Sequence, residues 1–299
     1  MQKILFATDL SSRADAAAQR AIALARAAGA ELRVVHVVEA DLEEETLRLL
    51  FRNHAGGVAD ATRELVNASE QRIAEQLSNG WAGEAPGYSV NCRFGRAHAE
   101  IAAEAREWDP DLVIIGDHTP QAVRDLLPGT TVEHLVHDLP QPVLVVKSAH
   151  EGPYRRVLVP MDFSERARYA AERASDVAPD AALELVTVFD SSPLERVYGY
   201  GGRAEQLNSA IEDGRQQAEQ QLAQAIESLD AGRRVNRYEA RAGQPVKSLL
   251  AAVEERGTDL VAMGTRGLSG WRGALVGSVA RRLAQQLECD VLLYGDGLG

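Results

Sequence analysis

The chain has 299 residues, a length that predicts two domains of roughly 150 residues, each large enough to bury a core. It is 45% hydrophobic and 25% charged, as in an ordinary soluble globular protein. The formal net charge of -12 argues against nonspecific binding to nucleic acid or to an anionic membrane, because both need a basic surface. Phosphate ligands are not excluded, because backbone amides can bind them.

The N-terminus predicts a first strand rather than a targeting segment. The apolar run at residues 4–6 is too short for a signal peptide, and no stretch approaches the roughly 20 apolar residues that span a bilayer. Cys92 and Cys289 lack the spacing of a metal or redox motif and are expected to be small buried residues. We therefore expect a cytoplasmic protein.

The first half alternates short β-branched runs with longer alanine-rich runs. The expected strands lie near residues 3–8, 31–38, 88–94, 111–116 and 142–147. Residues 112–115 are apolar on both faces, which is typical of a parallel strand covered by helices on both sides. Ser11 and Ser12 mark the start of the first helix, and Gly29 marks its end. An extra helix is expected from Asp41, followed by a long charged helix.

The second half repeats this alternation after a short polar linker near residues 148–153. We therefore expect domains at residues 1–148 and 153–299. The expected strands of the second domain lie near residues 156–161, 182–189, 234–240, 258–263 and 290–294. Ser164 before Glu165 marks a helix start. Residues 191–202 predict a mobile loop before another long charged helix.

The two halves are copies of one domain. Residues 4–11 read Ile-Leu-Phe-Ala-Thr-Asp-Leu-Ser and return at 157–164 as Val-Leu-Val-Pro-Met-Asp-Phe-Ser. The Asp-Leu-Val core at 111–113 returns at 259–261. Three glycines correspond at one constant offset to three others: Gly95, Gly116 and Gly129 to Gly243, Gly264 and Gly277. The duplication predicts two tandem α/β domains, each an open twisted parallel sheet flanked by helices.

A glycine-rich stretch after the fourth strand of the second half predicts a phosphate-binding loop. Gly264 and Gly267 let a ligand approach the main chain closely. Gly277 and Ser278 then open a helix whose amides and dipole favour an anion. Ligands of open parallel sheets bind at the carboxyl ends of the strands, where Asp162 also lies. Its carboxylate either accepts from an adenine amino group or ribose hydroxyl, or merely caps the following helix.

The pattern Gly264-x-x-Gly267 followed by Gly277-Ser278 resembles the ATP-binding motif of the universal stress protein family, and the likeness covers nearly the whole chain, twice. The resemblance implies five-stranded sheets of order 3-2-1-4-5 and a site for ATP, ADP or AMP, with Mg²⁺ as a further candidate. For adenine it implies Pro160, Asp162 and the backbone of Val188. It implies that Met263 and Gly264 line the base and the ribose. For the ribose and phosphates it implies Gly267, Gly277, Ser278 and Val279, with Arg266 as a phosphate neighbour.

The first half departs from this motif. It keeps the outer positions Gly116, Gly129 and Thr130. Thr119 replaces the second glycine, Pro120 stiffens the loop, and Asp117 is expected to place a negative charge beside the phosphates. At the end of its first strand this copy keeps Asp9 but has Ala7 in place of the proline. We therefore expect it to bind ATP poorly or not at all.

The histidines are given ordinary roles. His134 and His137 share a predicted helix face and could form a zinc site with His118, but no cysteine or carboxylate completes the set, so exposed or capping positions are favoured. His36 is expected in the core of a strand, and His98 is expected to cap a helix.

These observations favour an ATP-binding stress-response or regulatory protein whose nucleotide is held by the second domain. Two alternatives stay open: a slow Mg²⁺-dependent ATPase, and a structural or interaction module with a vestigial site. The ATPase is second because no general base or catalytic lysine is evident. We expect no nucleic-acid or membrane partner, and an internal pseudo-dimer through residues 143–146 and 291–294, with a homodimer also open.

Overall fold

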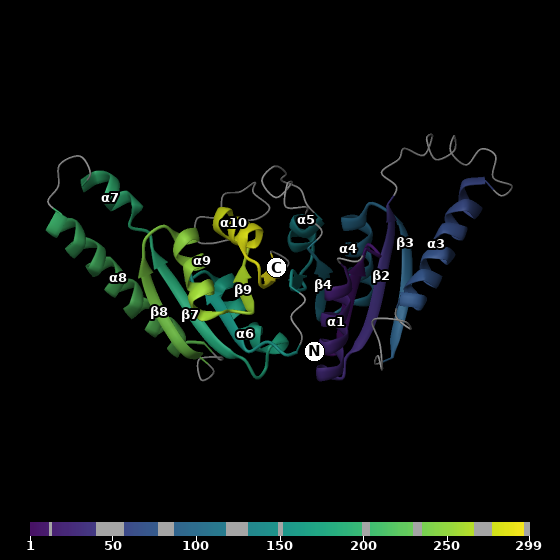
Figure 1. Ribbon diagram of the computed structural model, residues 1–299, viewed down its shortest axis with the longest axis horizontal. Helices are drawn as coiled ribbons and strands as arrows, with labels where there is room; N and C mark the ends of the chain where they lie inside the picture. The colour runs from purple at the N-terminus through teal and green to yellow at the C-terminus, as the bar shows by residue number, and fades with distance from the viewer. Residues whose placement is uncertain are drawn as a thin grey trace. The chain divides into compact units, whose positions relative to one another are not determined.

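The computed structural model forms two compact units, Met1–Glu151 and Gly152–Gly299. The structure describes residues 1–11, 14–39, 57–76, 87–117, 131–148, 152–198, 204–229, 235–265 and 277–295. In each unit, helices flank a parallel sheet (Figure 1). Within the described part of the chain, no helix is both long and apolar enough to cross a membrane.

The described strands of the N-terminal unit form a five-stranded parallel sheet of order β3-β2-β1-β4-β5. The strands are β1 (Lys3–Thr8), β2 (Glu31–Glu39), β3 (Tyr88–Gly95), β4 (Leu112–Gly116) and β5 (Val143–Val146). In β1 the register runs from Lys3 opposite Glu31 to Thr8 opposite His36. Every residue of β4 and β5 is buried, because helices cover both faces of these strands.

The parallel strands of this unit are joined by crossovers that contain helices. The helices are α1 (Ala14–Ala28), α3 (Gly57–Gln76), α4 (Ala97–Trp108) and α5 (Thr131–Asp138). Helix α1 packs on β1 and β4 and α3 packs on β3, whereas α4 packs on β2 and on α5. Strands β2 and β3 are added on one side of β1, and β4 and β5 are added on the other. Ligands of open parallel sheets bind beside such a switch point, here between β1 and β4.

The C-terminal unit repeats this plan with the order β10-β9-β6-β7-β8. Its strands are β6 (Arg156–Pro160), β7 (Ala182–Phe189), β8 (Val235–Ala242), β9 (Leu260–Gly264) and β10 (Asp290–Tyr294). Its helices are α6 (Glu165–Val177), α7 (Ser192–Tyr198), α8 (Ala204–Glu227), α9 (Pro245–Arg256) and α10 (Ser278–Gln286). The predicted strand order 3-2-1-4-5 is therefore confirmed in both units, and each strand lies within a residue or two of its predicted position.

Helix ends were predicted correctly where one residue type determines them. Gly29 has a φ of +63° and ends α1, and the Ser164 side chain caps α6. The mobile loop predicted across residues 191–202 was wrong in part, because α7 occupies Ser192–Tyr198. Pro193 lies in the first turn of this helix, where a proline is tolerated, and Asp190 accepts a hydrogen bond from the Ser192 amide (3.0 Å). The extra helix predicted from Asp41 lies outside the described residues.

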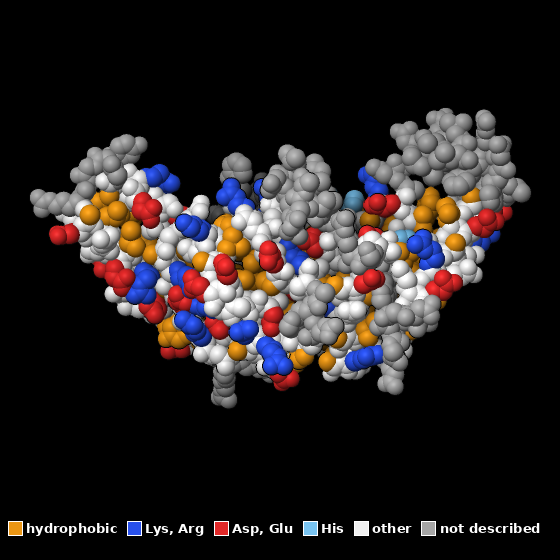
Figure 2. Space-filling model, viewed as in Figure 1, with side chains coloured by type: hydrophobic (Ala, Val, Ile, Leu, Met, Phe, Trp, Pro, Cys, Tyr) orange, Lys and Arg blue, Asp and Glu red, His pale blue; other side chains and the backbone are white. Residues whose placement is uncertain are grey.

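Among the residues that the structure describes, the face of the C-terminal unit seen in Figure 2 has no patch made of acidic side chains alone. Figure 2 shows acidic and basic side chains interspersed there. On α8, Arg215 forms short-range ion pairs with Glu212 (2.7 Å) and Glu219 (2.8 Å) of the same helix. A face of this mixed kind offers no extended field of one sign that would attract a charged ligand.

Candidate functional site

The turn after the first strand of the C-terminal unit positions Asp162. Its Oδ1 accepts hydrogen bonds from the Ser164 amide (3.0 Å) and the Ser164 hydroxyl (2.6 Å). The Ser164 hydroxyl accepts in turn from the Ala167 amide (3.2 Å), so Ser164 is the N-cap of α6. The capping role that was left open for Asp162 therefore belongs to Ser164. Among the described residues no hydrogen bond holds Asp162 Oδ2, and the side chain is exposed.

The same turn recurs in the N-terminal unit. Asp9 Oδ1 accepts a hydrogen bond from the Ser11 amide (2.9 Å). The residue after each aspartate has a left-handed backbone, with φ of +62° at Leu10 and +65° at Phe163. A non-glycine residue in this region costs about 1–3 kcal/mol and persists where the surrounding structure imposes it. The turn thus holds an aspartate beyond the end of the first strand in both copies.

A cavity of about 400 Å³ lies at the carboxyl ends of β6, β7 and β9, within the range of roughly 300–1,000 Å³ typical of small-molecule sites. Eight of the predicted site residues line it: Pro160, Asp162, Val188, Met263, Gly264, Gly277, Ser278 and Val279. The predicted residues Arg266 and Gly267 lie outside the described residues. The sequence missed further lining residues: Phe163, Ala167, Val186, Thr187, Pro245, Leu249, Thr265, Ala280 and Leu283.

The rim of this cavity is fixed by main-chain hydrogen bonds. The amide and the hydroxyl of Thr265 both donate to the carbonyl oxygen of Tyr294 (3.0 Å each). The Gly277 amide donates to the carbonyl oxygen of Thr265 (2.6 Å). The two segments that flank residues 266–276 are therefore joined to each other and to the last strand, and both line the cavity.

Helix α10 presents an open N-terminus to the cavity. Gly277 is its N-cap, and no side-chain hydrogen bond caps the helix. Ser278 and Val279 follow in the first turn and are exposed. The first amides of a helix have no intrahelical acceptor, and the helix dipole favours an anion beside them. This end of the cavity can therefore hold a phosphate group with backbone donors.

The two outer glycines of the predicted motif differ in what they do. Gly277 has φ -63° and ψ 150°, a conformation that any residue adopts. A Cβ on Gly264, in contrast, would lie 2.6 Å from the Cβ of Arg166 and 3.0 Å from the Arg166 carbonyl carbon. Gly264 therefore lets the end of β9 pack closely against the start of α6. The sequence argument assigned it only to ligand approach and missed this contact.

The N-terminal unit has a cavity of about 560 Å³ at the matching place, lined by Ala7, Thr8, Asp9, Val35, His36, Val37, Val38, Glu39, Ala97, Ile101, Ile115, Gly116, Thr131 and Val132. Asp117 is not among these lining residues. Its carboxylate lies 3.4 Å from the ammonium nitrogen of Lys147, and the two side chains are only 13% and 5% exposed. The negative charge expected beside the phosphates is therefore paired with a lysine. Thr119, Pro120, Gly129 and Thr130 lie outside the described residues.

His36 and His98 take other positions than the sequence predicted, whereas His137 is exposed as expected. His36 is half-buried and lines the N-terminal cavity instead of filling the core, with Nδ1 2.8 Å from the carbonyl oxygen of Thr8. His98 is not a cap, because Arg96 is the N-cap of α4; its ring stacks on that of His134, with centroids 4.4 Å apart. His137 lies in the last turn of α5, and His118 is outside the described residues. Across the described ranges, no group of three His, Cys, Asp or Glu side chains could hold a metal ion.

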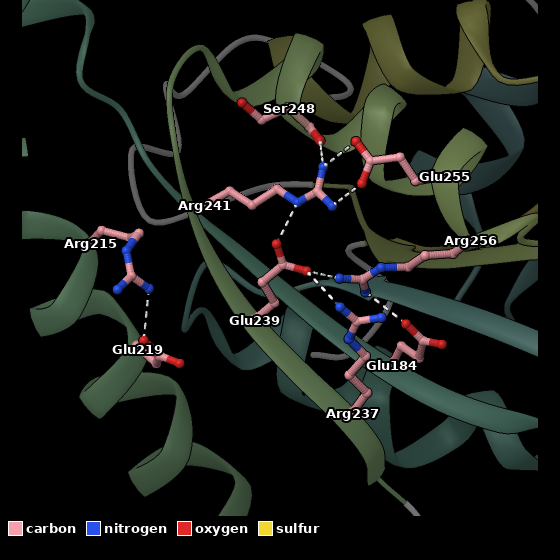
Figure 3. Close-up of polar contacts among 9 residues, drawn as sticks. All are labelled: Glu184, Arg215, Glu219, Arg237, Glu239, Arg241, Ser248, Glu255 and Arg256. Atoms are coloured by element: carbon pink, nitrogen blue, oxygen red, sulfur yellow. Dashed lines mark hydrogen bonds and ion pairs between the residues drawn. The ribbon is translucent and has the colours of Figure 1, made fainter. Parts of the chain in front are cut away.

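A cluster of ion pairs fastens α9 to the sheet of the C-terminal unit (Figure 3). Arg241 on β8 pairs with Glu239 (2.9 Å) and with Glu255 on α9, and Arg256 Nη1 lies 2.8 Å from Glu184 Oε2. The hydrogen bond from Arg241 lowers the pKa of Glu255 below its ordinary value. None of these residues is among those that line the cavity with Asp162, and the ion pairs join α9 to β7 and β8. Sequence reasoning missed this cluster.

The N-terminal unit carries a related cluster around Glu104 on α4, which is buried. Glu104 accepts from Arg33 Nη1 (2.9 Å) and Arg93 Nε (2.7 Å), and Arg93 also pairs with Glu107. Burial alone would raise the pKa of Glu104, but the hydrogen bonds from both arginines lower it below its ordinary value. Arg93 and Glu107 correspond at the offset of the duplicated glycines to Arg241 and Glu255. The recurrence of this arginine and glutamate in both halves is the sequence feature from which the ion pair could have been predicted.

Comparison with known proteins adds independent findings. A family model described as the universal stress protein family matches residues 1–147 and again 153–295. A universal stress protein of Mycolicibacterium smegmatis is 25% identical over 297 residues, covering 97% of this chain and 96% of the relative. One of Methanocaldococcus jannaschii is 28% identical over 145 residues, covering 48% of this chain and 83% of the relative. The crystal structure of a universal stress protein from Archaeoglobus fulgidus has a TM-score of 0.65 at 19% identity and covers 98% of both chains, which shows the shared fold.

Proposed function

The chain belongs to the universal stress protein family, and from this membership and the geometry of the C-terminal cavity we propose that its C-terminal unit binds an adenine nucleotide. The observation that carries the proposal is that one cavity is lined both by Asp162, whose Oδ2 no described residue holds, and by the uncapped N-terminus of α10. These two features suit the two chemically different ends of a nucleotide.

The aspartate end suits the base and the ribose. A carboxylate oxygen only accepts hydrogen bonds, so Asp162 needs a donor such as an exocyclic amino group or a ribose hydroxyl. Around it the cavity wall is apolar, with Pro160, Val188 and Met263. A flat aromatic base buries apolar surface against such a wall, and the carboxylate fixes its orientation.

The α10 end suits the phosphates. The first-turn amides, the helix dipole and the Ser278 hydroxyl all favour an anion. Arg281 and Arg282 are exposed on the same helix and add positive charge to this acidic protein. The resemblance of Gly264-x-x-Gly267 with Gly277-Ser278 to the family's ATP-binding motif supports ATP as the ligand. Mg²⁺ would accompany the polyphosphate.

We propose that the two domains, residues 1–148 and 153–299, differ in this respect, with the nucleotide held mainly by the second. A protein that binds ATP in one of two related units suits regulation, because occupancy of that unit can stabilise one state of the chain. Stress-response signalling is the role that the family membership supports.

Isothermal titration of ATP into the full chain and into two matched variants tests the proposal. Asp162→Asn keeps an oxygen that accepts from the Ser164 amide, so the turn is preserved while the second oxygen becomes a donor. Asp9→Asn makes the same change in the N-terminal unit. We expect Asp162→Asn to weaken ATP binding roughly tenfold or more and Asp9→Asn to leave it unchanged. Equal affinity in the wild type and Asp162→Asn would contradict the proposal.

A further inference from the structure

We infer that the cavity of the N-terminal unit is a second ligand site, which takes an unphosphorylated purine nucleoside rather than a nucleotide. The inference that its ligand contains a purine rests on the function proposed above for the C-terminal unit. The duplication places equivalent residues around the two cavities, and the residues that differ determine which ligand each cavity can hold.

The half of the cavity that would hold a base is retained. Asp9 and Asp162 occupy the same left-handed turn, accept from the amide two residues on, and line their cavities. Val37 takes the place of Val188 on the second strand, and Gly116 takes that of Gly264 on the fourth. The volume of about 560 Å³ leaves room for a base and a sugar.

The N-terminal cavity gains two threonine hydroxyls, Thr8 and Thr131, where the C-terminal cavity has Met161 and Val279, and it also gains acceptors. His36 lies where the C-terminal unit has Thr187, and Glu39 joins Asp9 among the lining residues. The Thr8 carbonyl can only accept, so His36 donates to it through Nδ1, which leaves Nε2 of the neutral ring as an acceptor. Acceptors of this kind recognise hydroxyl and amino groups, of which a nucleoside has several.

The same groups oppose phosphate. Asp9 and Glu39 are both acidic, whereas Asp162 is the one acidic residue among the described residues that line the C-terminal cavity. The described lining of neither cavity includes a lysine or an arginine. Lys147, the nearby cation that could have neutralised a phosphate, pairs with Asp117, and its side chain is 5% exposed. The first turn of α5, with Thr131 and Val132, lines this cavity as the first turn of α10 lines the other, so backbone donors do not separate the two units. The difference is the pair of carboxylates, which would repel the negative charge of a phosphate group.

The test uses adenosine and ATP as probes of the full-length chain. Adenosine is titrated into protein already saturated with ATP, so that the C-terminal unit is occupied, in the wild type, in Asp9→Asn and in the matched Asp162→Asn. We expect one adenosine site in the wild type and in Asp162→Asn, weakened roughly tenfold or more by Asp9→Asn. Thermal melting of Asp9→Asn checks that its fold is intact.

A second titration compares the two probes at the Asp9-dependent site, using the Asp162→Asn chain. We expect ATP to bind this site at least roughly tenfold more weakly than adenosine, because of the two carboxylates. An absence of Asp9-dependent adenosine binding, or ATP binding there as tightly as adenosine, overturns the inference. If ATP binds the C-terminal unit normally in that case, the proposed function stands. If ATP fails to bind the wild type while the Asp9-dependent adenosine site persists, only the proposed function fails.

Discussion

The amide of Gly277 donates a hydrogen bond of 2.6 Å to the carbonyl oxygen of Thr265, and this bond joins the end of β9 to the start of α10. Thr265 is in turn held by the carbonyl oxygen of Tyr294 at the end of β10. The uncapped amides of α10 are thus fixed relative to the sheet by main-chain contacts. Because the donors of this site are main-chain amides, a substitution near the helix start acts mainly through the volume of the new side chain.

Gly277→Val should abolish ATP binding while leaving the fold intact. The backbone at Gly277 (φ -63°, ψ 150°) accepts any residue, but a branched side chain would fill the space in front of the first-turn amides. For the wild type, ATP at one hundred times its dissociation constant should add about 2.7 kcal/mol of stability. Thermal melting with and without ATP measures this gain. A variant that melts like the wild type and is still stabilised by ATP would refute the assignment of α10.

Gly264→Ala should instead damage the fold. Its Cβ would lie 2.6 Å from the Cβ of Arg166, so β9 and α6 would have to move apart. Overpacking of this kind costs about 1–3 kcal/mol. Urea denaturation should therefore show a lower midpoint for Gly264→Ala, whereas Gly277→Ala serves as the control with an unchanged midpoint. If both variants unfold at the wild-type midpoint, the packing role given to Gly264 is wrong.

Ser164→Ala should lower both stability and ATP affinity. The hydroxyl caps α6 by accepting from the Ala167 amide and also donates to Asp162, so its loss removes a cap worth about 1 kcal/mol and loosens the carboxylate. Ser175→Ala on the same helix is the matched control, because that hydroxyl only donates to the Glu172 carbonyl within the helix. Denaturation and titration calorimetry measure the two effects. A loss of stability without any loss of affinity would separate Ser164 from the ligand site.

Much of the fold could be predicted because it depends on patterns that are local in sequence. The buried inner strands, such as β4 and β5, are runs of β-branched or apolar residues, and the constant offset of the glycines revealed the duplication. Even the αL helix ends match, at Asp109 (φ +52°) and Gly257 (φ +55°). The predicted site residues lay at strand and helix ends, and such positions in a parallel sheet converge on one edge.

Contacts between distant side chains could not be predicted. Arg33 on β2 lies 4.4 Å from the centre of the Trp108 ring at the end of α4. The equivalent positions of the C-terminal unit hold Glu184 and Arg256, which form an ion pair. Both pairs fasten equivalent helices to equivalent strands, but one is a cation over an aromatic ring and the other is a salt bridge, and the arginine lies on the strand in the first and on the helix in the second. Without the folded structure, nothing in the sequence shows that these positions meet.

Acidification should weaken the N-terminal unit through Glu104. Its pKa in the folded chain lies below the ordinary value of 4.5, so the carboxylate contributes stability above that pH, and the contribution is lost as the pH falls through the folded pKa. The melting temperature should therefore fall when the pH is lowered below the ordinary glutamate range.

Glu104→Gln tests this assignment. The variant should be less stable than the wild type at neutral pH, because Arg33 and Arg93 lose their charged partner, and its stability should depend less on pH. Melting curves of both proteins across the acidic range supply the comparison. Parallel pH profiles for the wild type and the variant would show that Glu104 is not the group responsible.

The stoichiometry of ATP binding to the full chain tests the central claim most directly. Calorimetric titration should give one ATP site per chain, because Thr119 and Pro120 interrupt the glycine motif of the first half and Glu39 adds a second carboxylate to the N-terminal cavity. Two equivalent sites per chain would contradict the asymmetry between the units, and a chain that binds no ATP would contradict the assignment of the C-terminal cavity.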